Sequence, residues 1–297
     1  MAVNLRKLGV VARFELGEAL RSRLVVVILS LYGAGAALGA YVFAKALGAA
    51  ESAARSALAD SMNAHDIPDD LVRREALPRV ISAFVEDPKL REELSRIDPL
   101  ALFYGLMALY LVAPLVLITS GGAHATDLAR GATRFVLTRC DRLSWALGKM
   151  LGHAALLATG LFTGALVTAA VATGQGRFDA GSLFWLLRAA FRAWVYGFAY
   201  LGIFTAVALV VRAPARARAM SVLALFGLWL GHGLAGSAWL NERLPFVDLL
   251  VWIFPGHYDL LLWSPSWLTS LPAMFALLSI GGAAFALGHM VFARGDA

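Results

Sequence analysis

The chain has 297 residues and a formal net charge of +6, with 60% hydrophobic and 15% charged residues. Its mean hydropathy is +0.71. An average soluble domain is about half apolar and about a quarter charged, so this composition excludes an ordinary soluble protein. The positive charge does not indicate a nucleic-acid partner, because basic residues of membrane proteins gather in loops that face anionic lipid. The single cysteine, Cys140, excludes an intrachain disulfide framework.

The first 23 residues are predicted to form a charged helix that lies at the membrane surface. The sequence VARFELGEALRSR leads directly into the first long apolar segment. The apolar residues on one helical stripe are Leu5, Leu8, Ala12, Leu16 and Ala19. Basic residues lie elsewhere on the helix, which is typical of an interfacial amphipathic helix, although Val10 and Phe14 fall outside the stripe.

Six apolar segments are long enough to cross a bilayer, which requires about 20 residues of helix. Five of them are intervals between charged residues: Arg23 to Lys45, Asp98 to Asp127, Lys149 to Arg177, Arg192 to Arg212, and Arg218 to Glu242. The sixth lies between Asp259 and Arg294 and is expected to begin near Pro272, because proline suits the first turn of a helix. The sequence therefore predicts an all-α fold, a polytopic membrane protein with six transmembrane helices in a single domain over residues 1–297.

The distribution of basic residues predicts the orientation. Lys and Arg gather in the first segment, in the connections after the second and fourth spans, and at the C-terminal end. The short connection between the third and fourth spans holds only Arg177. Because short cytoplasmic loops carry an excess of Lys and Arg, both termini are predicted to lie in the cytoplasm, with the chain in a bacterial inner membrane.

Two external connections have unusual compositions. Residues 46–99 are polar, with helix-like stretches broken at Pro68 and Pro88, and are predicted to form an external helical subdomain. Their basic residues do not change the orientation, because long loops translocate largely regardless of charge. Residues 242–270 are aromatic and broken by prolines, and their apolar stretch is too short to cross. A re-entrant hairpin and an interfacial loop both fit this segment; the re-entrant hairpin is the working prediction.

The sequence carries no catalytic or metal-binding pattern. The motifs HExxH and GxSxG and paired cysteines are missing, and no two of the six histidines lie four residues apart. Gly148-Lys149 does not belong to a phosphate loop, because Leu143 stands where glycine is needed and Met150 where Ser or Thr would hold magnesium. The chain is therefore predicted not to be an enzyme and to hold no metal or cofactor of its own.

Arg188 and Arg192 lie one helical turn apart at the expected outer end of the fourth span. They either extend to the external headgroups or form a contact for an anionic headgroup or substrate, since charge inside a membrane is costly and usually functional. In the second case, Gln at both positions is expected to weaken substrate binding or transport. The spans hold almost no other charge, which argues against an ion-coupled carrier.

The connection at residues 124–148 carries a recognisable pattern within TDLARGATRFVLTRCDRLSWALGKMLG. An acidic residue and Arg-Gly precede a short helix that ends in Leu-Thr-Arg, and a basic residue and Gly-Lys follow. This resembles the coupling segment of ABC transporter type-2 permeases, although Ala132 replaces the usual Thr or Ser and Cys140 the common Pro. The matching residues are Asp127, Arg130, Gly131, Leu137, Thr138, Arg139, Arg142, Gly148 and Lys149.

The six-span layout and the broken hairpin before the last span extend the resemblance over the whole chain. It implies that residues 1–23 are the family's cytoplasmic elbow helix and that a cytoplasmic ATP-binding subunit, which holds ATP and Mg²⁺, docks on the coupling segment. The residues it assigns to this coupling are Asp127, Arg130, Gly131, Arg139, Arg142 and Lys149. It also implies a second permease copy, identical or paralogous.

The resemblance thus predicts a permease subunit of an ABC transporter, of the exporter or mechanotransmitting type. Residues 46–99 would be available to a periplasmic partner. The alternative is a six-span assembly or structural subunit, or an intramembrane enzyme, with no ATPase partner. Co-purification of an ATPase discriminates between these classes.

Overall fold

The computed structural model describes residues 4–62, 68, 71–72, 94, 97–235, 237, 250–264 and 266–295. These residues form helices and contain no strand. The α-helices are α1 (Leu5–Arg21), α2 (Arg23–Met62), α5 (Pro99–Ser120), α6 (Ala123–Ala129), α7 (Ala132–Leu137), α8 (Arg142–Gly174), α9 (Ala180–Val211), α10 (Pro214–Ala235), α13 (Asp259–Trp263) and α14 (Trp267–Arg294). Two 3-10 helices, η1 (Val251–Ile253) and η2 (Pro255–Tyr258), precede α13.

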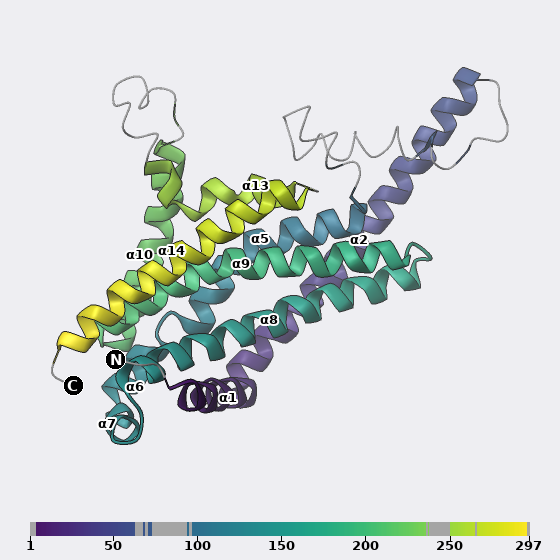
Figure 1. Cartoon of the computed structure of the whole chain (residues 1–297). Coiled ribbons are helices and arrows are strands. Elements are labelled where there is room, and N and C mark those ends of the chain that lie inside the picture. The colour runs from purple at the N-terminus through teal and green to yellow at the C-terminus, as the bar shows by residue number, and fades with distance from the viewer. Residues whose placement is uncertain are drawn as a thin grey trace.

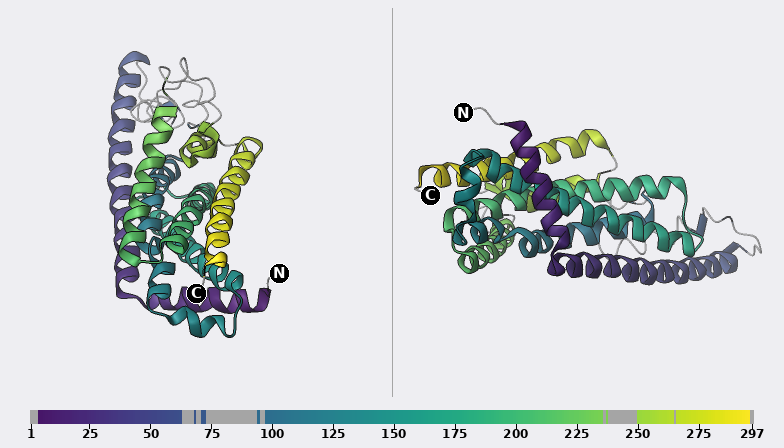
Figure 2. Two further views of the ribbon diagram at one scale, coloured as in Figure 1. Left: turned by 90° about the vertical axis from the view of Figure 1, so that its left-hand side faces the viewer. Right: turned by 90° about the horizontal axis from the view of Figure 1, so that it is seen from below.

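Six helical segments are long and apolar enough to cross a membrane, which confirms the predicted all-α fold and number of spans. They are α2, α5 with α6, α8, α9, α10 and α14. Both ends of the chain lie at the same end of this bundle, together with α1, α6 and α7 (Figure 1); we call it the termini end. Helix α1 crosses this end of the bundle instead of running along it (Figure 2).

Four spans begin earlier than the sequence predicts. Helix α8 begins at Arg142 instead of Lys149, α9 at Ala180 instead of Arg192, α10 at Pro214 instead of Arg218, and α14 at Trp267 instead of Pro272. Two of these starts are fixed by capping, because the side chains of Asp141 and Asp179 accept hydrogen bonds from the backbone N–H groups of Ser144 and Ser182. Two of the predicted boundary charges, Lys149 and Arg192, lie buried inside α8 and α9, where Glu15 and Ser264 accept hydrogen bonds from them.

Helix α2 is 40 residues long, which corresponds to about 60 Å at 1.5 Å per residue. A bilayer core is only about 30 Å thick, so α2 extends well beyond a single crossing. Residues 46–62, predicted as the start of the external subdomain, continue this helix without a break. Most of the predicted subdomain from 63 to 96 lies outside the described residues, so its structure stays a prediction.

Helix α9 lies at the centre of the bundle and packs against α14, α5 and α8. The approach of α9 to α14 is closest at Gly202 and Gly281. A Cβ added at Gly202 would overlap the Gly281 carbonyl oxygen, and one added at Gly281 would lie 2.7 Å from the Phe198 carbonyl oxygen. Small residues thus bring two backbones into direct contact, which is how helices associate inside membranes.

The hairpin predicted over residues 242–270 is described at 250–264 and from 266 onward. In this part η1, η2 and α13 form a chain of short helices that contacts α10 and α14. Residues 242–249 and 265 lie outside the described residues. The re-entrant character of the hairpin therefore stays a prediction.

Candidate functional site

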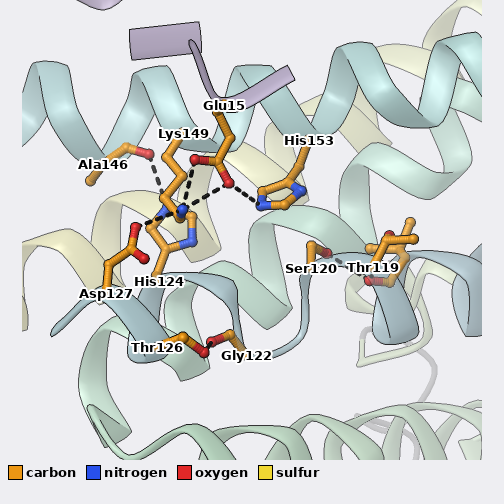
Figure 3. A network of polar contacts seen from close by, with 11 residues as sticks. Glu15, Thr119, Ser120, Gly122, His124, Thr126, Asp127, Ala146, Lys149 and His153 are labelled. Atoms are coloured by element: carbon orange, nitrogen blue, oxygen red, sulfur yellow. Dashed lines mark hydrogen bonds and ion pairs between the residues drawn. The ribbon is translucent and has the colours of Figure 1, made fainter. Parts of the chain in front are cut away.

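A buried lysine joins three helices at the termini end (Figure 3). The Nζ atom of Lys149 in α8 lies 2.7 Å from Glu15 Oε2 in α1 and 2.7 Å from Asp127 Oδ2 in α6. The Lys149 side chain is 5% exposed and that of Glu15 is 12% exposed. Charges removed from water need partners close by, so these contacts hold α1, α6 and α8 in one arrangement. We call Glu15, Asp127, Lys149 and His153 the Lys149 cluster.

His153 lies one helical turn beyond Lys149 and completes the cluster. Its Nε2 atom is 3.1 Å from Glu15 Oε1. Beside it, His124 of α6 is fully buried and donates from Nε2 to the carbonyl oxygen of Ala146, over 3.2 Å. Lys149 and His153 of α8 therefore both contact the Glu15 carboxylate of α1.

The Glu15 carboxylate keeps its charge in this environment. Burial by itself raises the pKa of a carboxyl group, but the contacts with His153 and Lys149 outweigh it and lower the pKa of Glu15 to about 2. Glu15 is therefore ionised from mildly acidic pH upward, and its ion pair with Lys149 is intact at neutral pH.

Two glycines let α1 rest directly on α8. A Cβ added at Gly148 would lie 2.9 Å from the Leu8 carbonyl oxygen, and one added at Gly152 would lie 3.0 Å from the Ala12 carbonyl oxygen. These glycines flank Lys149 and are four residues apart, so they lie on one face of α8. Gly148 therefore serves the packing of α1 on α8.

The segment between α6 and α8 contains a left-handed glycine and the short helix α7. Gly131, with φ of +71°, joins α6 to α7, and this left-handed conformation favours glycine. The short helix α7 ends at Leu137 and is followed by Thr138 and Arg139. Phe135 in α7 is 81% exposed, so α7 presents an apolar side chain outward.

The structure brings together only some of the predicted coupling residues. Asp127 and Lys149 meet in the cluster. Arg142 turns away and donates from Nη1 to the carbonyl oxygens of Ala293 and Gly295, at 2.8 and 3.0 Å, which ties α8 to the end of α14. Arg130 and Arg139 are exposed. Glu15 and His153 were missed, because nothing local to either residue indicates a partner on another helix.

A groove of about 850 Å³ lies between the start of α1 and α7. Arg6, Lys7 and Arg139 provide basic groups along it, and Val10 and Phe135 provide apolar ones. This combination fits a partner surface that is both acidic and apolar.

Arg188 and Arg192 lie inside α9 and are 6% and 5% exposed, so neither extends to the surface. Arg192 donates from Nη2 to the Ser264 carbonyl oxygen at 2.7 Å and to Ser270 Oγ at 3.2 Å. The Arg188 guanidinium lies 4.4 Å from the ring centre of Trp267. The cavity beside the pair measures about 20 Å³, close to the space of one water. The geometry therefore ties the end of the hairpin to α9; an anionic ligand contact stays a prediction.

Arg192→Gln is expected to lower the free energy of unfolding by about 1.5–3 kcal/mol, the range for hydrogen bonds to charged groups. Thermal unfolding of the purified protein in detergent measures the loss. Arg177→Gln is the matched control, because Arg177 pairs with Glu51 in a partly exposed bridge that contributes about 0–1 kcal/mol. Equal losses in both variants would contradict an anchoring role for Arg192.

Comparison with known proteins agrees with this arrangement. No curated protein sequence matches the chain. The family model described as ABC-2 family transporter protein matches residues 10–296, which includes the Lys149 cluster, the segment around α7 and all six spans. The chain therefore belongs to the ABC-2 family of transporter proteins and is a membrane subunit of an ABC transporter.

Proposed function

We propose that this chain is the permease subunit of an exporter or mechanotransmitting ABC transporter, driven by a separate ATP-binding subunit that docks on the termini end. The Lys149 cluster is the observation that carries the proposal. It connects α1, which lies outside the spans, and α6, at the end of the second span, to the spanning helix α8 through ion pairs of 2.7 Å. Because breaking a buried ion pair destabilises the protein, a displacement of α1 or α6 is transmitted to α8.

The groove between α1 and α7 is the docking surface in this proposal. Arg139 and Lys7 attract an acidic partner surface, and the exposed Phe135 offers an apolar anchor. The termini end then faces the cytoplasm of a bacterial cell, as the basic residues of the short loops predict. ATP and Mg²⁺ belong to the partner subunit.

A second permease copy, identical or paralogous, completes the transporter in this proposal. In the most apolar stretch of each helix, only 22% of the residues of α2 and 17% of those of α10 are buried inside the chain, against 61% for α9. Their exposed faces offer surface for a second copy in addition to lipid.

Charge reversal in the groove tests the docking. Arg139→Glu is expected to reduce recovery of the ATP-binding subunit by about tenfold, since like charges in an interface cost more than about 1.4 kcal/mol. Recovery is measured per tagged permease after affinity purification from membranes. Arg55→Glu is the control, because it changes an exposed position in the last turns of α2, a helix that runs away from the termini end (Figure 1).

Unchanged recovery with Arg139→Glu would place docking elsewhere. If no ATP-binding subunit accompanies the unaltered chain, the proposal fails and the assembly-subunit alternative is favoured. Arg142 is unsuitable for this test, because its bonds to Ala293 and Gly295 make its replacement disturb the bundle itself.

Of the two types in this proposal, the mechanotransmitting one would transmit force to external machinery instead of moving a solute. The length of α2 favours it, because this helix continues well past the thickness of a bilayer. A helix that projects from the membrane offers a surface to a periplasmic partner, together with the segment that follows it.

A further inference from the structure

A cavity of about 350 Å³ lies between the middle of α5, the middle of α9, the end of α10 and the hairpin. Its size falls within the range of about 300–1,000 Å³ that is typical of small-molecule sites. Neither the family match nor the sequence patterns assign a role to this cavity. It lies far along the spans from the Lys149 cluster, since α10 and the hairpin meet at the other end of the bundle (Figure 1).

The lining combines aromatic rings with one carboxylate. Tyr110, Tyr196, Trp229 and Trp263 supply the rings, and Asp259 is the only acidic residue among the described lining residues. The described lining contains no Lys or Arg, and His232 is its single basic side chain. Tyr110 and Trp229 are exposed while Tyr196 and Trp263 are buried, so the aromatic wall runs from the surface inward.

The Asp259 carboxylate has few partners. It accepts a hydrogen bond from the neighbouring Leu260 N–H, and among the described residues no Lys, Arg or His lies within ion-pair distance of it. The imidazoles of His232 and His257 are near enough to favour its charge, yet burial dominates and raises its pKa. A negative charge beside a bilayer-spanning bundle is costly without a counter-charge.

An organic cation fits both the aromatic rings and the carboxylate of this lining. Ring faces attract a cation within about 6 Å, most strongly for Trp, and the carboxylate supplies the counter-charge. The rings also shield an apolar body from water. The negative charge of Asp259 would repel an anion. An uncharged ligand would leave this charge without a counter-charge.

We infer that this cavity binds a lipophilic organic cation, with its ammonium group against Asp259 and its apolar part against Tyr196, Trp229 and Trp263. The inference rests on the proposed transport function, in which such a cation is the class of substrate moved. The ammonium group belongs either to a soluble amine or to the headgroup of a zwitterionic lipid.

Binding to the full-length chain, without any ATP-binding subunit, tests this site. The chain is placed in nanodiscs of phosphatidylglycerol and titrated with tritiated benzyltrimethylammonium. We expect saturable binding, and Asp259→Asn is expected to raise Kd by about tenfold or more, as for loss of a charged partner. Asp259→Glu, which keeps the charge, should retain binding. Asp60→Asn makes the same change at an exposed position of α2 and should leave Kd unchanged.

Neopentylbenzene, in which carbon replaces the ammonium nitrogen, should compete about tenfold more weakly than the unlabelled cation. Equal competition by this neutral analogue, stronger competition by benzenesulfonate, or an unchanged Kd in Asp259→Asn would each overturn the inference. Because no ATP-binding subunit is present, such a failure leaves the docking proposal intact, and a failed docking test leaves this site intact.

Nanodiscs of phosphatidylethanolamine identify the source of the cation. A higher apparent Kd for the probe in this lipid means that the headgroup occupies the cavity. The same Kd in both lipids means that the ligand is a soluble cation.

Discussion

Lys149→Met is expected to release α1 from α8 and to lower the free energy of unfolding by roughly 3–5 kcal/mol, the cost of breaking a buried ion pair from one side. The substitution leaves the carboxylates of Glu15 and Asp127 facing each other without the cation between them. Cys140 reports the release. It is 8% exposed and lines the groove against α1, so its rate of maleimide labelling should rise in the variant.

A double variant distinguishes the effect of the unpaired charge from the effect of the lost packing of Lys149. Glu15→Gln combined with Lys149→Met removes one of the two uncompensated charges, and we expect it to recover part of the lost stability. Arg177→Met breaks the partly exposed bridge between Arg177, which follows α8, and Glu51 of α2. It should cost about 0–1 kcal/mol and leave Cys140 labelling unchanged. A Lys149→Met protein that behaves like Arg177→Met would show that the cluster does not hold α1.

Gly202→Ala is expected to push α9 away from α14 and to cost about 1–3 kcal/mol or more. The added methyl group would overlap the Gly281 carbonyl oxygen, which belongs to a helix backbone and cannot rotate aside. Thermal unfolding in detergent measures the loss. The effect should be large because α14 packs more extensively on α9 than on any other described helix.

Gly282, which follows Gly281 in α14, offers a control for this substitution. Gly282→Ala changes a glycine of α14 whose added Cβ would meet nothing within 4 Å. It should be neutral or stabilising by up to about 1 kcal/mol, because alanine is the better helix former. Equal unfolding temperatures for Gly202→Ala and Gly282→Ala would contradict a direct contact between the backbones of α9 and α14.

The number of spans was predictable because it depends on a local quantity, the length of apolar sequence needed to cross a bilayer. The helix boundaries were less predictable. The sequence pattern places the ends of spans at charged residues, yet Lys149 and Arg192 lie inside α8 and α9. Each is accepted there by groups far away in the chain, Glu15 and Ser264. Hydropathy measures the cost of burying a charge but contains nothing about distant partners that offset it.

The site was predictable to the extent that it resembles a family pattern. The short helix α7 and the turn at Gly131 follow that pattern, and Asp127 and Lys149 do meet. Glu15 lies 134 residues from Lys149, so no local spacing relates the two. Gly148 and Gly152 carried a usable signal, since small residues four apart indicate a close helix contact. They did not indicate that the contacting helix would be α1.

The bonds from Arg142 to Ala293 and Gly295 have a consequence for biosynthesis. Chains emerge from the ribosome N-terminus first, and early segments fold before late ones exist. Helices α1 and α6 can gather around Lys149 once the third span has been made, but the start of α8 gains its contact with α14 only after the sixth. Arg142 follows the groove residue Cys140 by two positions, so the chain beside the proposed docking surface is tied to the bundle only in a permease whose spans have all been synthesised.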